Sequence, residues 1–89
     1  MSRYYFDTRN GSDHVRDDQG FELSDFTAAR KLAERSLIEL ARDDSLGSAK
    51  RTFSVDVRDH LSRTLLTTEL VMETRVLSPD LAEVRVSSA

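Results

Sequence analysis

Hydrophobic and polar side chains alternate through residues 3–9 of the chain. Tyr4 and Phe6 share one parity, while Tyr5 and Asp7 take the other. A period of two residues is typical of a strand that buries one face against a core and leaves its other face open. The alternation therefore predicts that Tyr4 and Phe6 line the core and that Tyr5 lies on the opposite face of a sheet.

Turn signals follow this first strand. Asn10-Gly11 supplies two residues that tolerate positive φ, which favours a tight hairpin. The expected return strand, residues 13–17, is short and charged, as in edge strands that discourage pairing with another chain. A second turn over residues 17–20 then leads to a short alternating stretch at residues 21–23.

A helical period replaces the alternation after Ser24 and Asp25, either of which can cap the first turn. The stretch from Phe26 to about Leu46 contains neither Gly nor Pro, and Gly47 is placed to end the helix. One arc of this helix is apolar and rich in alanine, which lets the helix axis approach a sheet closely. The arc comprises Phe26, Ala29, Ala33, Ser36, Leu37, Leu40 and Ala41.

Alternation returns after the helix. Residues 53–57 predict another half-buried strand, residues 59–63 a turn, and the segment 64–77, which is rich in Thr, Val and Leu, a final strand. Because this segment is long for one strand, we expect a bulge near Thr67-Thr68 or a break before Met72.

These elements together predict an α+β fold of β-β-α-β-β order, with a small antiparallel sheet and one amphipathic helix packed on one face. Residues 1–77 are expected to form this single domain. Residues 78–89 form a C-terminal tail with an ambiguous pattern, because its Ser-Pro-Asp start can begin a helical turn whereas residues 83–86 alternate as in a short added strand.

Composition narrows the possible classes of protein. At 89 residues the chain is one domain, and without cysteine it has neither disulfides nor thiolate metal sites. Its 13 basic and 16 acidic residues give a net charge of −3, which repels a polyanion at long range. No segment has the roughly 20 apolar residues of a membrane span, and the start of the chain lacks the apolar region of a signal peptide, so we expect a cytoplasmic protein without membrane contact.

Two motifs occur at the amino end. Residues 3–11 read R-Y-Y-F-D-T-R-N-G, and residues 17–25 read D-D-Q-G-F-E-L-S-D directly before the alanine-rich helix. Over roughly residues 2–70 the chain resembles a family of short alphaproteobacterial proteins of unknown function, which open with R-Y-[FY]-F-x-x-R-[DN]-G and D-x-x-G-x-E-L-x-D. It departs from that pattern at Asp7, where the family usually has His, and at Asn10, where Asp is usual. The resemblance implies a small α+β domain and lends no activity.

The residues give little support for a catalytic or metal-binding site. Five acidic residues lie between residues 13 and 25, but their spacing is not that of a calcium loop, and a turn with a helix cap explains them. His14 and His60 fall in predicted charged turns. The three glycines form neither a phosphate-binding loop nor a nucleophile elbow, and one helix on one sheet leaves little room for a pocket. We therefore expect no enzyme activity, no catalytic or metal-binding residues and no cofactor.

The bare sheet face and the last strand are the surfaces that favour binding. The segment 64–77 is apolar on both parities, so we predict that it pairs with a second copy, edge to edge or face to face, through Leu65, Val71 and Val76. The predicted function is that of a small non-catalytic interaction protein that forms a homodimer.

An RNA- or DNA-contacting module is the alternative function. The bare sheet face is expected to carry Tyr5, Arg3 and Arg58, a set that can stack a base and hold phosphates. Because base-stacking sheets usually present two or three aromatic residues, a single exposed tyrosine makes nucleic acid the less favoured partner.

Overall fold

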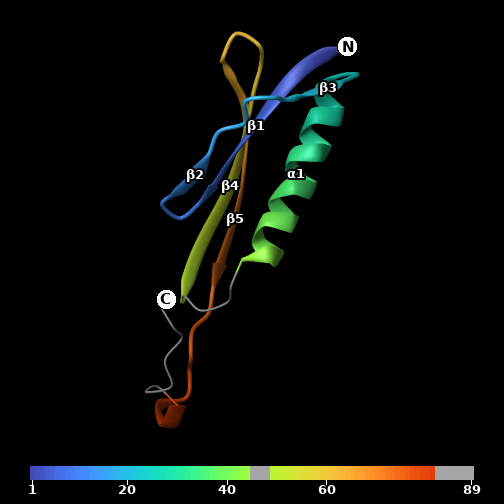
Figure 1. The fold of residues 1–89 in the computed structure, drawn as a ribbon. Helices are drawn as coiled ribbons and strands as arrows, with labels where there is room; N and C mark the ends of the chain where they lie inside the picture. Colours follow the sequence, from blue (N-terminus) through green and yellow to red (C-terminus); the bar gives the residue numbers. More distant parts are fainter. Residues whose placement is uncertain (45–48, 82–89) are drawn as a thin grey trace.

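The computed structural model describes residues 1–44 and 49–81, in which five strands and one α-helix form an α+β fold (Figure 1). This is the architecture that the alternation predicts, with one short strand more. The elements in chain order are β1 (Ser2–Asn10), β2 (Asp13–Val15), β3 (Phe21–Leu23), α1 (Phe26–Asp43), β4 (Lys50–Arg58), β5 (Thr64–Glu73) and the 3₁₀ helix η1 (Pro79–Leu81).

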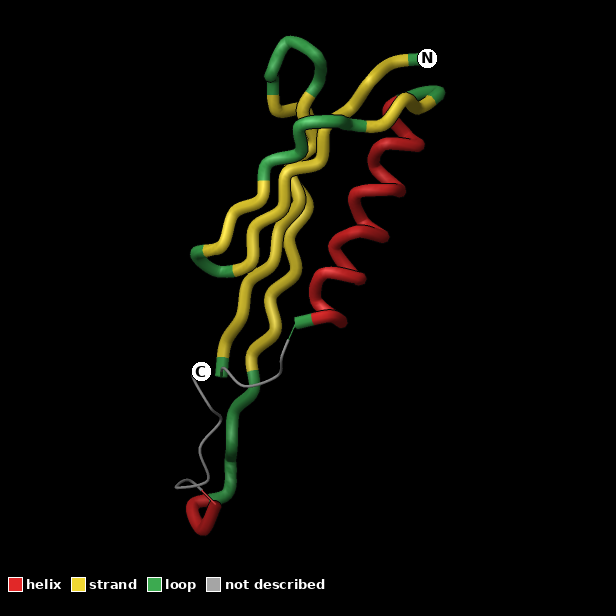
Figure 2. Tube along the Cα trace, viewed as in Figure 1, coloured by secondary structure: helices red, strands yellow, loops and turns green. Residues whose placement is uncertain are grey.

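The sheet is antiparallel throughout and has the strand order β2-β1-β4-β5, with β3 also paired to β1 (Figure 2). One edge of β1 is therefore divided between two short strands. β3 pairs with residues 2–4, and β2 pairs with residues 8–10. The other side of β1 pairs with β4, and β5 lies beyond β4 as the last strand.

The core lies between α1 and one face of β1 and β4. Tyr4 and Phe6 are only 9% and 8% exposed, which confirms that these two aromatic rings line the core. From β4 the core takes Phe53, Val55 and Val57, and from α1 it takes Ala29, Ala33 and Leu37. The fully buried alanines let the helix lie close to the sheet, as the alanine-rich arc predicts (Figure 1).

The helix is shorter than predicted. It ends at Asp43, because the backbone of Asp44 is extended. The predicted end at Leu46 and the predicted terminator Gly47 lie outside the described residues. At the other end Asp25 is the cap, and its Oδ1 accepts a hydrogen bond from the Ala28 N–H at 2.9 Å. Phe26 was expected on the buried arc but is 42% exposed, because the first helical residue lies at the rim of the core.

The helix is amphipathic along its 18 residues, with buried positions on one side only. In the part of the chain that the structure describes, no helix is long and apolar enough to pass through a bilayer.

The first hairpin differs from the prediction by one residue. Asn10 pairs with Asp13 as part of the sheet, so the two loop residues are Gly11 and Ser12 rather than Asn10 and Gly11. Gly11 has a φ of 60°, as a glycine at the first loop position of a tight hairpin requires. The return strand β2 ends at Val15 instead of residue 17, because the chain then forms the turn that leads along the same edge of β1 to β3.

The prediction for the last strand was wrong about its irregularity. β5 runs without a break from Thr64 to Glu73, and the register shift lies at Leu65, not near Thr67-Thr68 or before Met72. Val57 faces Leu66 whereas Arg58 faces Thr64, so Leu65 is the extra residue of a bulge. The bulge adjoins the hairpin turn, where Ser62 takes a φ of 64°.

The chain leaves the sheet after β5. Residues 74–78 lead away from the body to η1, which confirms the helical turn at Ser-Pro-Asp (Figures 1 and 2). The alternative, a strand over residues 83–86, falls outside the described residues.

Candidate interaction surface

We call the sheet face turned away from α1 the open face. Side chains alternate along strands, and the core takes even-numbered residues of β1 and odd-numbered residues of β4. The odd-numbered residues of β1 and the even-numbered residues of β4 therefore lie on the open face. The register places Tyr5 opposite Arg58 and Asp7 opposite Asp56. Polar and charged side chains therefore cover the centre of the open face, and their partners decide what it can bind.

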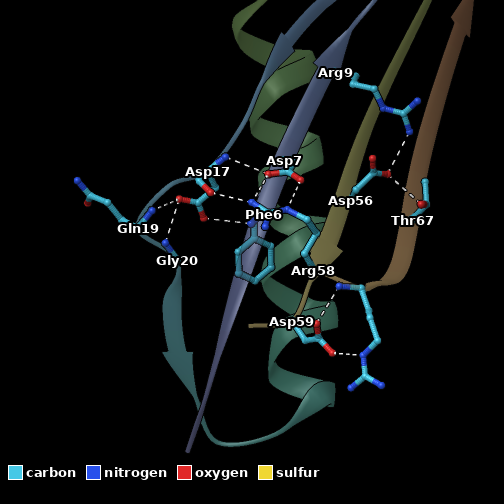
Figure 3. A network of polar contacts seen from close by, with 11 residues as sticks. Phe6, Asp7, Arg9, Asp17, Gln19, Gly20, Asp56, Arg58, Asp59 and Thr67 are labelled. Atoms are coloured by element: carbon cyan, nitrogen blue, oxygen red, sulfur yellow. Dashed lines mark hydrogen bonds and ion pairs between the residues drawn. The ribbon is translucent and has the colours of Figure 1, made fainter. Parts of the chain in front are cut away.

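Arg58, the last residue of β4, lies on the open face and is only 8% exposed. Its Nε and Nη2 donate to the two carboxylate oxygens of Asp7 at 2.6 and 3.1 Å, and Nη2 also donates to the Asp17 carbonyl at 2.8 Å (Figure 3). The guanidinium carbon lies 5.0 Å from the centre of the Tyr5 ring. These contacts, chiefly the hydrogen bonds to Asp7, raise the pKa of Arg58.

Asp17 fills a gap at the edge of β1. β3 ends its pairing at Tyr4 and β2 begins its pairing at Thr8, so the N–H of Phe6 has no strand beside it. The Asp17 carboxylate accepts that N–H at 3.0 Å (Figure 3). It also accepts the N–H groups of Gln19 and Gly20, both at 3.0 Å, which closes the turn between the two short strands. Asp17 thus replaces a missing strand partner.

The carboxylates of Asp7 and Asp17 both have lowered pKa values. For each, partial burial acts to raise the pKa, but donors to the charged form outweigh it. Those donors are the Arg58 guanidinium and the Asp17 N–H for Asp7, and the N–H groups of Gly20, Phe6 and Gln19 for Asp17. Both groups therefore stabilise the fold as anions.

Two further arginines of the open face are paired with carboxylates. Arg9 Nη2 donates to Asp56 at 3.0 Å, and the same Asp56 oxygen accepts from the Thr67 hydroxyl at 2.8 Å (Figure 3). Arg3 donates to Glu22 at 3.3 Å, in a more exposed pair. These pairs offset the positive charge of the arginines locally, so the open face offers little attraction to a phosphate.

The turn between β4 and β5 is organised by Asp59. Its carboxylate accepts the N–H groups of Leu61 and Arg63, both at 2.9 Å, and the Nε–H of Arg63 at 2.8 Å. Chiefly the hydrogen bond from the Arg63 N–H lowers the pKa of Asp59. These hydrogen bonds fix the turn from which β5 begins.

β5 is the outermost strand, and no other strand of residues 1–44 and 49–81 pairs with its outer edge. The Thr74 N–H donates to the Ala49 carbonyl at 2.7 Å, so even-numbered positions hydrogen-bond towards β4. By alternation, the N–H and C=O groups of Thr67, Glu69 and Val71 point outwards.

Apolar side chains accompany this free edge on both faces. On the open face, Leu65 is 41% and Val71 is 49% exposed. On the helix side, Leu70 is 38% and Met72 is 41% exposed, although both face the side on which the core lies. The edge therefore combines apolar area with backbone groups that no described strand pairs.

The structure separates the predicted surface residues into three groups. Arg3, Tyr5 and Arg58 lie on β1 and β4, Leu65 and Val71 lie on β5, and Val76, 40% exposed, lies beyond the sheet. Arg58 is not available as a surface contact because Asp7 and Asp17 occupy it.

The sequence did not reveal three features of this surface. These are the role of Asp7, the role of Asp17, and the exposure of the pair Leu70 and Met72. The Asp-x-x-Gly spacing at residues 17–20 was a signal for a turn carboxylate. No sequence signal shows that Asp7 contacts Arg58, because that contact depends on the register of β1 against β4.

The molecule also has a hollow of about 430 Å³ beside α1, on the helix side of β1 and β2. Phe6, Val15 and Phe21 line it together with the polar chain around Asp17 and Ser36 of the helix. The Asp17 carboxylate at its border already accepts three backbone N–H groups, so it is committed to the fold. Among residues 1–44 and 49–81, no group of three or more His, Asp or Glu side chains is placed to hold a metal ion.

Comparison with known proteins adds one assignment. A search of curated proteins found no match, and a search of solved structures found none either. Residues 3–71, from the first strand to the second half of β5, match the sequence pattern of one protein family. The chain therefore belongs to the family described as a domain of unknown function, DUF6894.

Proposed function

We propose that this chain is a non-catalytic interaction protein that forms a homodimer through β5. The observation that carries the proposal is the outer edge of β5, ten residues long, without a strand beside it among the described residues and flanked by half-exposed leucine, valine and methionine. An edge of this kind is a template for pairing with another strand. A second copy supplies a strand of the same length and chemistry.

The two edges of the sheet differ in how they are protected. The edge at β1 is split between two strands of three residues each, and the Asp17 turn covers the gap between them. Short edge strands and charged residues are the devices by which proteins prevent edge-to-edge pairing. β5 contains neither Lys, Arg nor Pro; its charged residues are Glu69 and Glu73, and its bulge lies at its start rather than in its middle. The contrast favours β5 as the interaction edge.

The alternative functions have weaker support. A nucleic-acid platform needs arginines that are free to meet phosphates, whereas Arg58 and Arg9 are hydrogen-bonded to Asp7 and Asp56. An enzyme needs acid and base groups that are poised near neutral pH, whereas the shifted carboxylates Asp7 and Asp17 are held as anions by donors of the fold. Both observations favour a binding role for β5 over chemistry on the open face.

The first test is the mass of the full chain in solution. We expect multi-angle light scattering at micromolar concentration to give twice the 10.1 kDa of one chain. Val71→Lys places a charge on the β5 edge at a half-exposed site, so it should shift the mass to that of a monomer without unfolding the protein. Val15→Lys is the matched control, because Val15 is 64% exposed on the opposite edge of the sheet.

Two results would contradict the proposal. One is a wild-type mass of 10.1 kDa over the whole micromolar range. The other is a dimer that survives Val71→Lys but dissociates with Val15→Lys, which would place the interface at the edge formed by β2 and β3. Circular dichroism of both variants checks that the fold is retained.

A further inference from the structure

We infer that the two copies pair their β5 strands antiparallel, edge to edge, with a two-fold axis that passes between the Thr68 residues of the two copies. This inference rests on the proposed homodimer and specifies how the two strands meet. It follows from three features of β5: the direction of its free backbone groups, the position of its bulge and the order of its side chains.

The backbone limits the possible registers. The outward N–H and C=O groups belong to odd-numbered residues of β5, as the Thr74 to Ala49 hydrogen bond shows. In an antiparallel pair, outward-pointing residues of one strand must face outward-pointing residues of the other. The numbers of two facing residues therefore sum to an even value, and the axis passes through a residue position rather than between two positions.

The bulge and the strand ends leave three registers with extensive overlap. β5 ends at Glu73 and is irregular at Leu65, so a long paired segment needs its centre near the middle of the strand. The axis can pass at Thr68, Glu69 or Leu70. Each choice brings a different set of side chains together across the interface, and the chemistry of those pairs separates the three.

Two of the three registers pair unlike or repelling side chains. An axis at Glu69 sets the two Glu69 carboxylates directly opposite each other, and facing like charges destabilise a sheet. An axis at Leu70 pairs the two Leu70 side chains, but it places each Glu69 against the partner's Val71 and each Thr68 against the partner's Met72. In that register most apolar side chains of the edge meet polar ones.

The axis at Thr68 matches side chains of the same kind. Leu66 faces the partner's Leu70 on the helix side, and Leu65 faces the partner's Val71 on the open face. The two Thr68 residues face each other, which is a favourable cross-strand pair. Glu69 faces the partner's Thr67, and the two Glu69 residues stand diagonally, with backbone positions about 7–8 Å apart, instead of opposite each other.

This arrangement has a definite shape. The axis is perpendicular to the sheet, so both helices lie on the same side, and the five strands of each copy join into one continuous sheet. The segment that follows β5 then runs alongside the partner's β4–β5 turn. Val76 and Leu61, 40% and 60% exposed in the single chain, come from these two segments.

Single cysteines can test the register because the chain has no cysteine of its own. Facing residues at a pair that is not hydrogen-bonded have Cα atoms about 4.5 Å apart, within the span of a disulfide. We expect Thr68→Cys to form a disulfide-linked dimer under mild oxidation, at least tenfold faster than Glu69→Cys or Leu70→Cys. All three variants are made in the full chain, and their cross-linked fraction is measured by non-reducing electrophoresis at a concentration at which light scattering shows a dimer.

The outcomes separate the inference from the proposed function. Fastest cross-linking by Thr68→Cys supports this register, whereas fastest cross-linking by Leu70→Cys or Glu69→Cys overturns it in favour of a shifted one. If the wild type has the mass of a dimer and none of the three variants cross-links, the edge-to-edge arrangement is wrong while self-association stands. A monomeric wild type removes the proposed function and the register together.

Discussion

Gly20 lies where the chain runs along the edge of β1 into β3, and its replacement by alanine gives the sharpest test of the fold. Gly20 has a φ of 71°, in the left-handed region, and a Cβ built there would lie 2.8 Å from the Tyr4 carbonyl oxygen. It would also lie 3.0 Å from side-chain atoms of Arg3 and Tyr5. Those side chains can move, but the Tyr4 oxygen belongs to the backbone of β1, so the turn at residues 17–20 must shift instead.

Gly11 provides a matched comparison for this substitution. Its φ of 60° is also left-handed, but nothing lies within 4 Å of its Cβ position. Gly11→Ala therefore carries only the left-handed cost of roughly 1–2 kcal/mol, offset by about 0.4–1 kcal/mol from the reduced entropy of the unfolded chain. Gly20→Ala has the same two contributions, and the close contact with Tyr4 is an additional cost. Overpacked side chains typically destabilise a protein by about 1–3 kcal/mol, which we take as the size of this cost.

The assay is equilibrium denaturation of both variants at one protein concentration. We expect Gly20→Ala to be less stable than Gly11→Ala by about 1–3 kcal/mol, with a melting temperature lower by at least about 4 °C. Equal stabilities, within about 0.5 kcal/mol, would show that the turn relaxes freely around Tyr4. In that case the Asp17 turn would not be a fixed support of β1, and the account of this edge would be wrong.

Two further predictions concern single carboxylates. Asp25→Ala removes the acceptor of the Ala28 N–H, so it should lower the free energy of unfolding, measured by chemical denaturation, by about 1 kcal/mol. The neighbouring Ser24→Ala should lower it little, and equal effects of the two substitutions would show that Asp25 is not the cap. The pKa values of Asp7 and Asp17 are lowered in the folded state, so the stability they supply is complete above the unfolded value near 3.8 and is lost as pH falls through the lower folded values. The melting temperature should therefore decrease as the pH is lowered below about 4. Asp17→Asn already lacks this carboxylate, so its melting temperature should decrease less steeply. The same pH dependence in both proteins would contradict the role given to Asp17.

Much of the fold follows from periodicity. Alternation in β1 and β4 identifies the core residues Tyr4, Phe6 and Val55, because a two-layer domain buries one parity of each central strand. The alanine-rich arc identifies the face of α1 that packs against them. Element ends were less predictable: the helix ends at Asp43 because the backbone of Asp44 is extended, and no capping signal at these two residues marks that end in the sequence.

The polar side of the sheet was harder to predict than the core. Arg58 is on the predicted face, yet it is buried because Asp7 and Asp17 meet it from β1 and from the turn after β2. The three residues are far apart in sequence, and only the register of β1 against β4 brings Asp7 within reach. Composition gives the number of charges, but not which arginine is neutralised and which remains exposed.

β5 differs from the two central strands, β1 and β4, in what surrounds it. β1 and β4 each have neighbours on both sides and a core that buries one face. Within residues 1–44 and 49–81, β5 has one neighbour, and its apolar side chains stay half exposed on both faces. A longer hairpin alone stabilises such a strand only a little, because each added residue buries only part of its surface. The strand gains more from a second neighbour, which satisfies the outward N–H and C=O groups and covers Leu70 and Val71 together. If the neighbour is another copy, association contributes directly to the stability of β5, and the free energy of unfolding of this small domain includes a term that depends on its concentration.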